Sequence, residues 1–277
     1  MSLLELVVNP NPGRKTLPDC CNPETFADVR AFHRTLPGYQ PTPLVALPDL
    51  AKELGVKGVY IKDESKRFGL NAFKALGASY AIHKLFPDGN VGLTVTATDG
   101  NHGKGMAWST HRLGGHAVVF MPAGTVDSRV EAIRAIGDTE VTVTDLNYDG
   151  TVATAAAYAK EHGGHLVQDT AFAGYEEVPQ NITLGYSTMA AEALEELAAL
   201  GVGEPTHTFL QAGVGSMAGG VAAYLAETCK NPPAMAVVEA WESACVLESI
   251  RQGKLVTIEG HTQTSMAGLN CGTPNPQ

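Results

Sequence analysis

A glycine-rich segment, Gln211-Ala-Gly-Val-Gly-Ser-Met-Ala-Gly-Gly220, follows a predicted strand and opens a predicted helix. Amide groups at a helix N-terminus attract anions, and glycine lets a ligand approach the backbone closely. A phosphate group is therefore the expected ligand, although a tight strand-to-helix turn would use the same glycines. The residues expected to bind it are Gly213, Val214, Gly215, Ser216, Met217, Ala218 and Gly219.

The same segment also fits the dinucleotide pattern G-x-G-x-x-A, with Gly213, Gly215 and Ala218. Glu239 ends the next predicted strand, 24 residues after Gly215, close to where a ribose-binding acid belongs. On this loop alone, a nicotinamide-dependent oxidoreductase remains an open alternative.

Lys74 lies in the first turn of a predicted helix whose neighbouring residues are mostly apolar. Desolvation and the positive end of the helix dipole should both disfavour its ammonium form and lower its pKa. An amine of this kind is a usable nucleophile for a Schiff base. The alternative is an ordinary exposed lysine on an amphipathic helix.

Two carboxylates follow predicted strands directly. Asp99 lies in the segment Thr96-Ala-Thr-Asp-Gly-Asn-His-Gly103, which also contains Asn101, and Asp169 lies in Gln168-Asp-Thr170. Both could serve as acids or bases at the carboxyl edge of a sheet. Helix capping and turn formation are the alternatives for these residue types.

Other kinds of function have less support. The 277 residues carry a net charge of −10 without a basic stripe, which disfavours nucleic acid and anionic membranes as partners. No apolar run approaches the ~20 residues of a membrane helix, and no secretory signal is expected at the N-terminus. Nine histidines show no metal-ligand spacing, and no G-x-S-x-G elbow indicates a hydrolase. Five cysteines form no even disulfide framework, so we expect a cytoplasmic protein.

Short β-rich runs alternate with longer Ala-rich helical runs along most of the chain. This alternation predicts an α/β fold with parallel sheets covered by helices on both faces. In such sheets ligands bind beyond the carboxyl ends of the strands, where the segments above are placed. Strands are predicted at 58–61, 91–97, 117–121, 140–144, 165–168, 206–211 and 234–239, and helices at 71–86, 103–113, 126–136, 150–161, 182–200, 217–228 and 243–252.

Taken together, the segments resemble the fold type II pyridoxal-phosphate enzymes, the tryptophan synthase β-like superfamily. Within it they are most similar to the diaminopropionate ammonia-lyases, whereas serine and threonine dehydratases typically have Ser or Ala where this chain has Asp99. The likeness extends from about residue 25 onward. It rests on Lys62-Asp-Glu-Ser-Lys-Arg-Phe-Gly-Leu-Asn-Ala-Phe-Lys74, Thr98 to Gly103, Gln168 to Thr170 with Gly174-Tyr175, Gln211 to Gly220, and Met266 to Asn275.

The resemblance implies a role for each candidate residue. Lys74 would hold pyridoxal 5′-phosphate as a Schiff base, Asn101 would bind its phenolic oxygen, and residues 213–220 would bind its phosphate. Asp99 and Asp169 would face the amino-acid substrate as acid, base or ammonium-binding groups. The implied reaction is α,β-elimination of 2,3-diaminopropionate to pyruvate and ammonia. Because Lys74 and Asp99 are two candidate bases, we further hypothesise that they lie on opposite faces of the substrate, which would allow both enantiomers to react.

The resemblance also implies the architecture. We expect two three-layer parallel-sheet domains: a small one over residues 88–188, and a large cofactor-binding one from residues 1–87 and 189–277. The family continues beyond the position of Gln277, so we expect a C-terminally truncated chain. A homodimer is implied, and a bridge between Cys245 and Cys271 is conceivable. The functional alternatives are a dehydratase-like lyase, a nicotinamide-dependent oxidoreductase and an inactive remnant.

Overall fold

The computed structural model describes residues 5–9, 17–258 and 264–276. Most of the N-terminal segment considered for a signal, and Gln277, lie outside these ranges. The elements that precede the four-stranded sheet are α1 (Pro23–Thr35), β1 (Leu44–Ala46), α2 (Pro48–Leu54), β2 (Tyr60–Lys62), a 3₁₀ segment η1 (Glu64–Gly69) and α3 (Lys74–Leu85).

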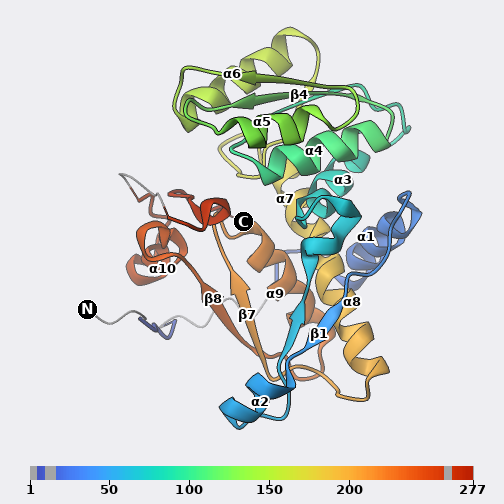
Figure 1. Cartoon of the computed structure of the whole chain (residues 1–277), viewed down its shortest axis with the longest axis vertical. Coiled ribbons are helices and arrows are strands. Elements are labelled where there is room, and N and C mark those ends of the chain that lie inside the picture. The colour runs from blue at the N-terminus through green and yellow to red at the C-terminus, as the bar shows by residue number, and fades with distance from the viewer. Residues whose placement is uncertain (1–4, 10–16, 259–263, 277) are drawn as a thin grey trace.

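A four-stranded parallel sheet in the order β5-β4-β3-β6 forms the upper part of the molecule in Figure 1. Alternate residues of its central strands face opposite sides. Val118 and Phe120 pack against Ala155 and Ala159 of α6. The other face packs against α4 and α5, so three layers result. The elements are β3 (Leu93–Ala97), α4 (Asn101–Arg112), β4 (His116–Met121), α5 (Asp127–Arg134), β5 (Thr139–Val143), α6 (Tyr148–Glu161) and β6 (His165–Leu166).

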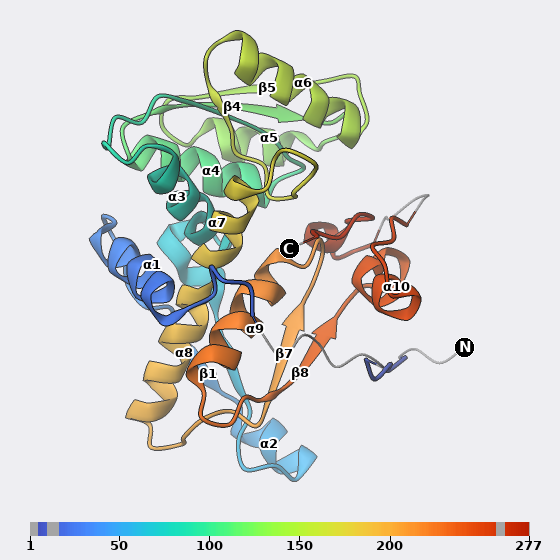
Figure 2. The same cartoon turned by 180° about the vertical axis from the view of Figure 1, so that it is seen from behind.

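The lower part contains a two-stranded parallel sheet, β7–β8, and a cluster of helices (Figure 2). Helix α3 packs against both α4 and α7, so it joins the two parts. The remaining elements are α7 (Glu177–Gly185), α8 (Ser187–Ala199), β7 (His207–Gln211), α9 (Ser216–Thr228), β8 (Ala234–Val238), η2 (Trp241–Ser243), α10 (Cys245–Gln252) and η3 (Ala267–Leu269).

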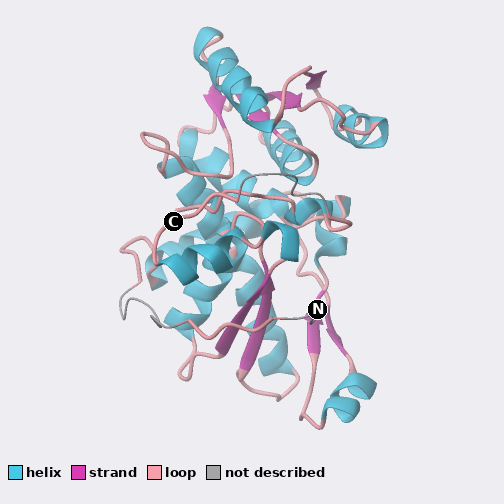
Figure 3. Cartoon of the chain, turned by 90° about the vertical axis from the view of Figure 1, so that its left-hand side faces the viewer, coloured by secondary structure: helices cyan, strands magenta, loops and turns pink. Residues whose placement is uncertain are grey.

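The predicted α/β class is confirmed, but two details of the prediction are wrong. Strands β1 and β2 pair antiparallel, as a separate ribbon beside β7–β8 (Figure 3), because a connection through the short helix α2 folds the chain back on itself. The single helix predicted over 182–200 is two helices that meet at Tyr186. At that junction α7 crosses α3 so closely that a Cβ on Gly185 would lie 2.6 Å from the Leu76 carbonyl oxygen.

Helices α1 and α2 were not predicted. Asn22 caps α1 by accepting a hydrogen bond from the Thr25 amide at 2.9 Å, a local signal that was present in the sequence. Within the residues that the structure describes, no helix is long and apolar enough to cross a membrane.

Candidate active site

Lys74 and Asp169 meet although 95 positions separate them. Lys74 is the first residue of α3, and Asp169 follows β6 at the carboxyl edge of the four-stranded sheet. The Lys74 Nζ donates to Asp169 Oδ2 at 2.7 Å, and the two side chains are only 19% and 10% exposed. Two of the three residues expected to carry the chemistry are thus in direct contact.

The expected lowering of the Lys74 pKa is wrong. Burial does favour the neutral amine, but the adjacent Asp169 carboxylate outweighs it and raises the pKa of Lys74 above its ordinary value. Burial likewise opposes the charge on Asp169, and the ammonium of Lys74 reverses this and lowers the pKa of the carboxyl. In this state the two groups form a partly buried ion pair.

Side chains from neighbouring segments fix the position of Asp169. Gln168, just before it, is buried, and its Oε1 accepts hydrogen bonds from the Thr96 hydroxyl at 3.0 Å and the Ala97 amide at 3.1 Å. The Gln168 amide donates to the Tyr175 hydroxyl at 2.7 Å. The motif segment Gln168 to Thr170 with Tyr175 therefore anchors the carboxylate at the end of β6.

Asp99 and Asn101 lie on the turn between β3 and α4. The Asp99 carboxyl is partly buried, and burial raises its pKa, aided by Asp169 and opposed by Arg129 and Lys74. Arg129 also donates to the Asp99 backbone carbonyl at 3.1 Å. Asn101 begins α4 with an exposed side chain, and a Cβ on Gly268 would lie 3.9 Å from its Nδ2.

The glycine-rich segment forms the turn from β7 into α9, as predicted. Gly215 has φ +96°, a conformation that L side chains rarely adopt. At Gly213, a Cβ would lie 3.1 Å from the Cys271 Sγ, closer than ordinary van der Waals contact, so a side chain there would require its neighbours to shift. The first turn of α9, whose amides are of the kind that attracts anions, lies beside Asp169, because the Ser216 hydroxyl donates to the Asp169 carbonyl at 3.2 Å.

Asn275 joins the glycine-rich loop to the Asp169 segment, a role that was not predicted from the sequence. Its Nδ2 donates to the Ser216 hydroxyl at 2.8 Å, and its Oδ1 accepts from the Ala171 amide at 3.3 Å. Its own amide donates to the Val214 carbonyl at 2.7 Å. The segment from Met266 to Asn275 thus closes over the loop.

Two further side chains at Lys74 were missed. His102 is buried, and its Nδ1 lies 3.7 Å from Asp169 Oδ2. Tyr186 is fully buried, with its ring centroid 6.0 Å from the Lys74 Nζ. Nδ1 of His102 and the hydroxyls of Tyr186 and Thr183 are buried without a hydrogen-bond partner among the described residues. Only the position of His102 inside the Thr98 to Gly103 motif could have pointed to it.

A helix end of the kind that attracts anions, a partly buried amine and buried polar atoms without a partner among the described residues fit pyridoxal phosphate, which carries a phosphate and an aldehyde. Glu239 does not fit the dinucleotide alternative, because its carboxylate accepts from the Val246 and Leu247 amides at 2.9 and 2.8 Å and so caps α10. Cys245 and Cys271 are free thiols. In the described part of the chain, no cluster of three His, Cys, Asp or Glu residues could hold a metal.

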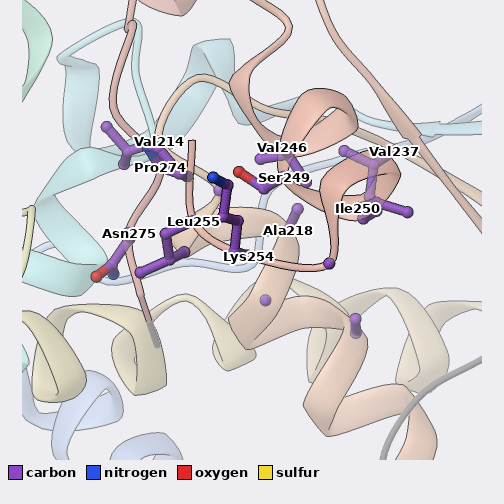
Figure 4. A pocket seen from close by; sticks show the side chains of 14 residues that line it. Val214, Ala218, Val237, Val246, Ser249, Ile250, Lys254, Leu255, Pro274 and Asn275 are labelled. Atoms are coloured by element: carbon purple, nitrogen blue, oxygen red, sulfur yellow. The ribbon is translucent and has the colours of Figure 1, made fainter. Parts of the chain in front are cut away.

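A cavity of about 480 Å³ lies between the glycine-rich loop with the start of α9 on one side and α10 on the other (Figure 4). Val214, Ala218 and Asn275 line it from the loop side, and Val246 and Lys254 line it from the α10 side. Lys74, Asp99 and Asp169 do not line this cavity.

Residues 35–277 match the family described as pyridoxal-phosphate dependent enzyme. Diaminopropionate ammonia-lyase of Escherichia coli strain K12 is 46% identical over 267 residues, covering 90% of this chain and 67% of the relative. A biosynthetic L-threonine dehydratase of Haemophilus influenzae is 30% identical over 249 residues, covering 90% of this chain and 44% of the relative.

The solved structures agree with this relationship. The holo diaminopropionate ammonia-lyase of Escherichia coli superposes with a TM-score of 0.87 at 43% identity, covering 95% of this chain and 70% of that one. The same enzyme in complex with an aminoacrylate-PLP azomethine reaction intermediate gives the same values. The predicted fold type and the predicted cofactor are thereby confirmed. The chain belongs to the family of pyridoxal-phosphate-dependent enzymes, as a relative of its diaminopropionate ammonia-lyases.

Proposed function

We propose that this chain catalyses the α,β-elimination of 2,3-diaminopropionate, in which one water is consumed and pyruvate and two molecules of ammonia are formed. The observation that carries this proposal is the partly buried Lys74–Asp169 pair, held against the glycine-rich N-terminus of α9 by Ser216. The 46% identity to diaminopropionate ammonia-lyase supports the same substrate.

Lys74 would hold pyridoxal phosphate through its amine, residues 213–219 would bind the phosphate, and Asn101 would bind the phenolic oxygen. The cofactor supplies an electron sink for the α-carbon of a bound amino acid. Asp169 would keep Lys74 in place through their 2.7 Å contact and would attract the substrate ammonium.

Asp99 would act as an acid. Burial and Asp169 raise its pKa, so this carboxyl keeps a proton more readily than an exposed aspartate does. It could then protonate the β-amino group as that group leaves. We further propose that Lys74 and Asp99 remove the α-proton from opposite faces, so that each serves one enantiomer. Asp99 would remove the proton in its ionised form and then donate that proton to the leaving β-amino group. If Asp99→Asn lost activity toward both enantiomers to the same extent, this assignment of one base to each enantiomer would be contradicted.

The test is a visible absorption spectrum of the purified chain with pyridoxal phosphate, before and after 2,3-diaminopropionate. We expect a cofactor band that Lys74→Ala lacks, and pyruvate formation on adding substrate. A band with turnover of serine or threonine alone would indicate a dehydratase-like lyase. A folded chain without any band would contradict the proposal and favour an inactive remnant.

The proposal also covers the assembly. We propose a cytoplasmic homodimer with a small domain over residues 88–188 and the flanks as the large domain. All four strands of the larger sheet fall within residues 93–166, which supports that boundary, and the free thiols of Cys245 and Cys271 fit a reducing compartment. Light scattering of the purified chain measures the oligomeric state.

A further inference from the structure

Lys74 must lose a proton before its amine can attack an aldehyde, yet Asp169 stabilises the ammonium form. A site with little access to water requires a nearby proton acceptor, because loss of the proton from Lys74 leaves the Asp169 carboxylate without a cationic partner. The Asp169 side chain is only 10% exposed, so water is a poor substitute for the lost cation.

His102 offers the required position. Its Nε2 lies 2.7 Å from the Val167 carbonyl oxygen. A carbonyl only accepts hydrogen bonds, so Nε2 carries the hydrogen and the neutral ring has a bare lone pair on Nδ1. That buried Nδ1 has no hydrogen-bond partner among the described residues, and it lies 3.7 Å from Asp169 Oδ2. An acceptor facing a carboxylate is the arrangement that one added proton converts into a charge-assisted hydrogen bond.

We propose that His102 takes up the proton that Lys74 loses, so that the cation beside Asp169 moves from the Lys74 amine to the His102 ring. Lys74 changes from ammonium to amine, and His102 changes from imidazole to imidazolium at Nδ1. Asp169 stays ionised throughout, so the net charge of the three groups is zero before and after the transfer. The distance from Nδ1 to Oδ2 shortens from 3.7 Å to roughly 2.8 Å.

The surroundings of His102 agree with this exchange. Burial lowers its pKa, Lys74 lowers it further, and Asp169 and Asp99 raise it. While Lys74 is an ammonium, a second cation is therefore disfavoured and the ring stays neutral. Once the Lys74 charge is gone, burial still opposes protonation of the ring, and the carboxylates of Asp169 and Asp99 favour it.

The proposal is tested on the ring itself, with ¹⁵N-detected tautomer spectra of the histidine side chains in the ligand-free chain. His102→Gln assigns the His102 signals. We expect a neutral, Nε2-protonated ring at neutral pH in the unchanged chain, and a doubly protonated ring in Lys74→Met. Lys74→Gln serves as the second charge-removing variant, and circular dichroism confirms that each variant is folded.

Two controls separate this exchange from a general loss of positive charge. Lys104→Met removes a cation from α4 whose Nζ donates to the Leu70 carbonyl at 2.7 Å, and it should leave His102 neutral. Asp169→Asn combined with Lys74→Met should return the ring to the neutral form. A His102 ring that stays neutral in both Lys74 variants, or is doubly protonated in the unchanged chain, overturns the inference.

This inference rests on the proposed function, because it assigns the proton that Lys74 must lose. The two fail separately. A chain without elimination activity still reports the state of its His102 ring, whereas an active enzyme whose ring never changes would overturn only the proton exchange.

Discussion

Glu192 is a fully buried acid on α8, and its replacement by alanine should strongly destabilise the chain. Its carboxylate accepts from Arg67 at 2.9 and 2.7 Å and lies 3.0 Å from the Lys62 Nζ. The Thr42 amide also donates to it, at 3.1 Å. Arg67 has no exposed side-chain surface either, so removing Glu192 leaves its guanidinium short of a charge partner.

The expected cost follows from this burial. Removing one partner of a buried ion pair costs about 3–5 kcal/mol of the free energy of unfolding, because the other charge remains in a low-dielectric environment. Glu64 still pairs with Arg67 at 2.7 Å, so we expect the lower half of that range, about 3–4 kcal/mol. Arg67→Met added to Glu192→Ala should recover part of the loss.

The matched control is Glu195→Ala on the same helix. Glu195 pairs with Arg30 at 2.7 Å and Arg34 at 3.2 Å, but its side chain is 52% exposed. An exposed ion pair contributes about 0.2–1 kcal/mol, so this variant should unfold at nearly the same urea concentration as the parent. Urea denaturation followed by circular dichroism measures both. Equal losses for Glu192→Ala and Glu195→Ala would refute the reasoning from burial.

Three further outcomes are expected. Gly220→Ala should lower the free energy of unfolding by about 1–3 kcal/mol in thermal melts, because its Cβ would lie 2.1 Å from the Thr183 carbonyl oxygen. Gly219→Ala, with no contact closer than 4.0 Å, should not destabilise, and equal losses would contradict the packing argument. Burial lowers the pKa of His33 to about 3 in the folded chain, whereas its value in the unfolded chain is about 6.5. Between these pH values the unfolded chain binds a proton at His33 and the folded chain does not. As the pH falls from about 6.5 to about 3, the free energy of unfolding should therefore fall by up to about 1.4 kcal/mol per pH unit. His33→Gln should show a shallower fall if His33 is responsible. After borohydride reduction, mass spectrometry should find pyridoxal phosphate covalently attached to the parent chain but not to Lys74→Ala. Retention of that label in the variant would place the attachment elsewhere.

Much of the candidate site could be predicted from local sequence. A strand followed by Gly213, Gly215 and a helix is a local pattern, because backbone geometry and helix-end amides depend on adjacent residues. The same holds for the carboxylates that follow strands, since a parallel sheet places the ends of its strands at one edge. Lys74, Asp99 and Asp169 are accordingly predicted from the sequence alone.

The sequence by itself determined the α/β alternation, the phosphate-binding type of loop and the residue types at the site, because each depends on neighbours a few positions apart. Only the tertiary structure decided which of those residues touch. The contact of Lys74 with Asp169 spans 95 positions and reversed the expected direction of the lysine pKa. The packing of His102 against that pair and of Glu192 against Arg67 likewise arises from long-range folding, and no local periodicity encodes it.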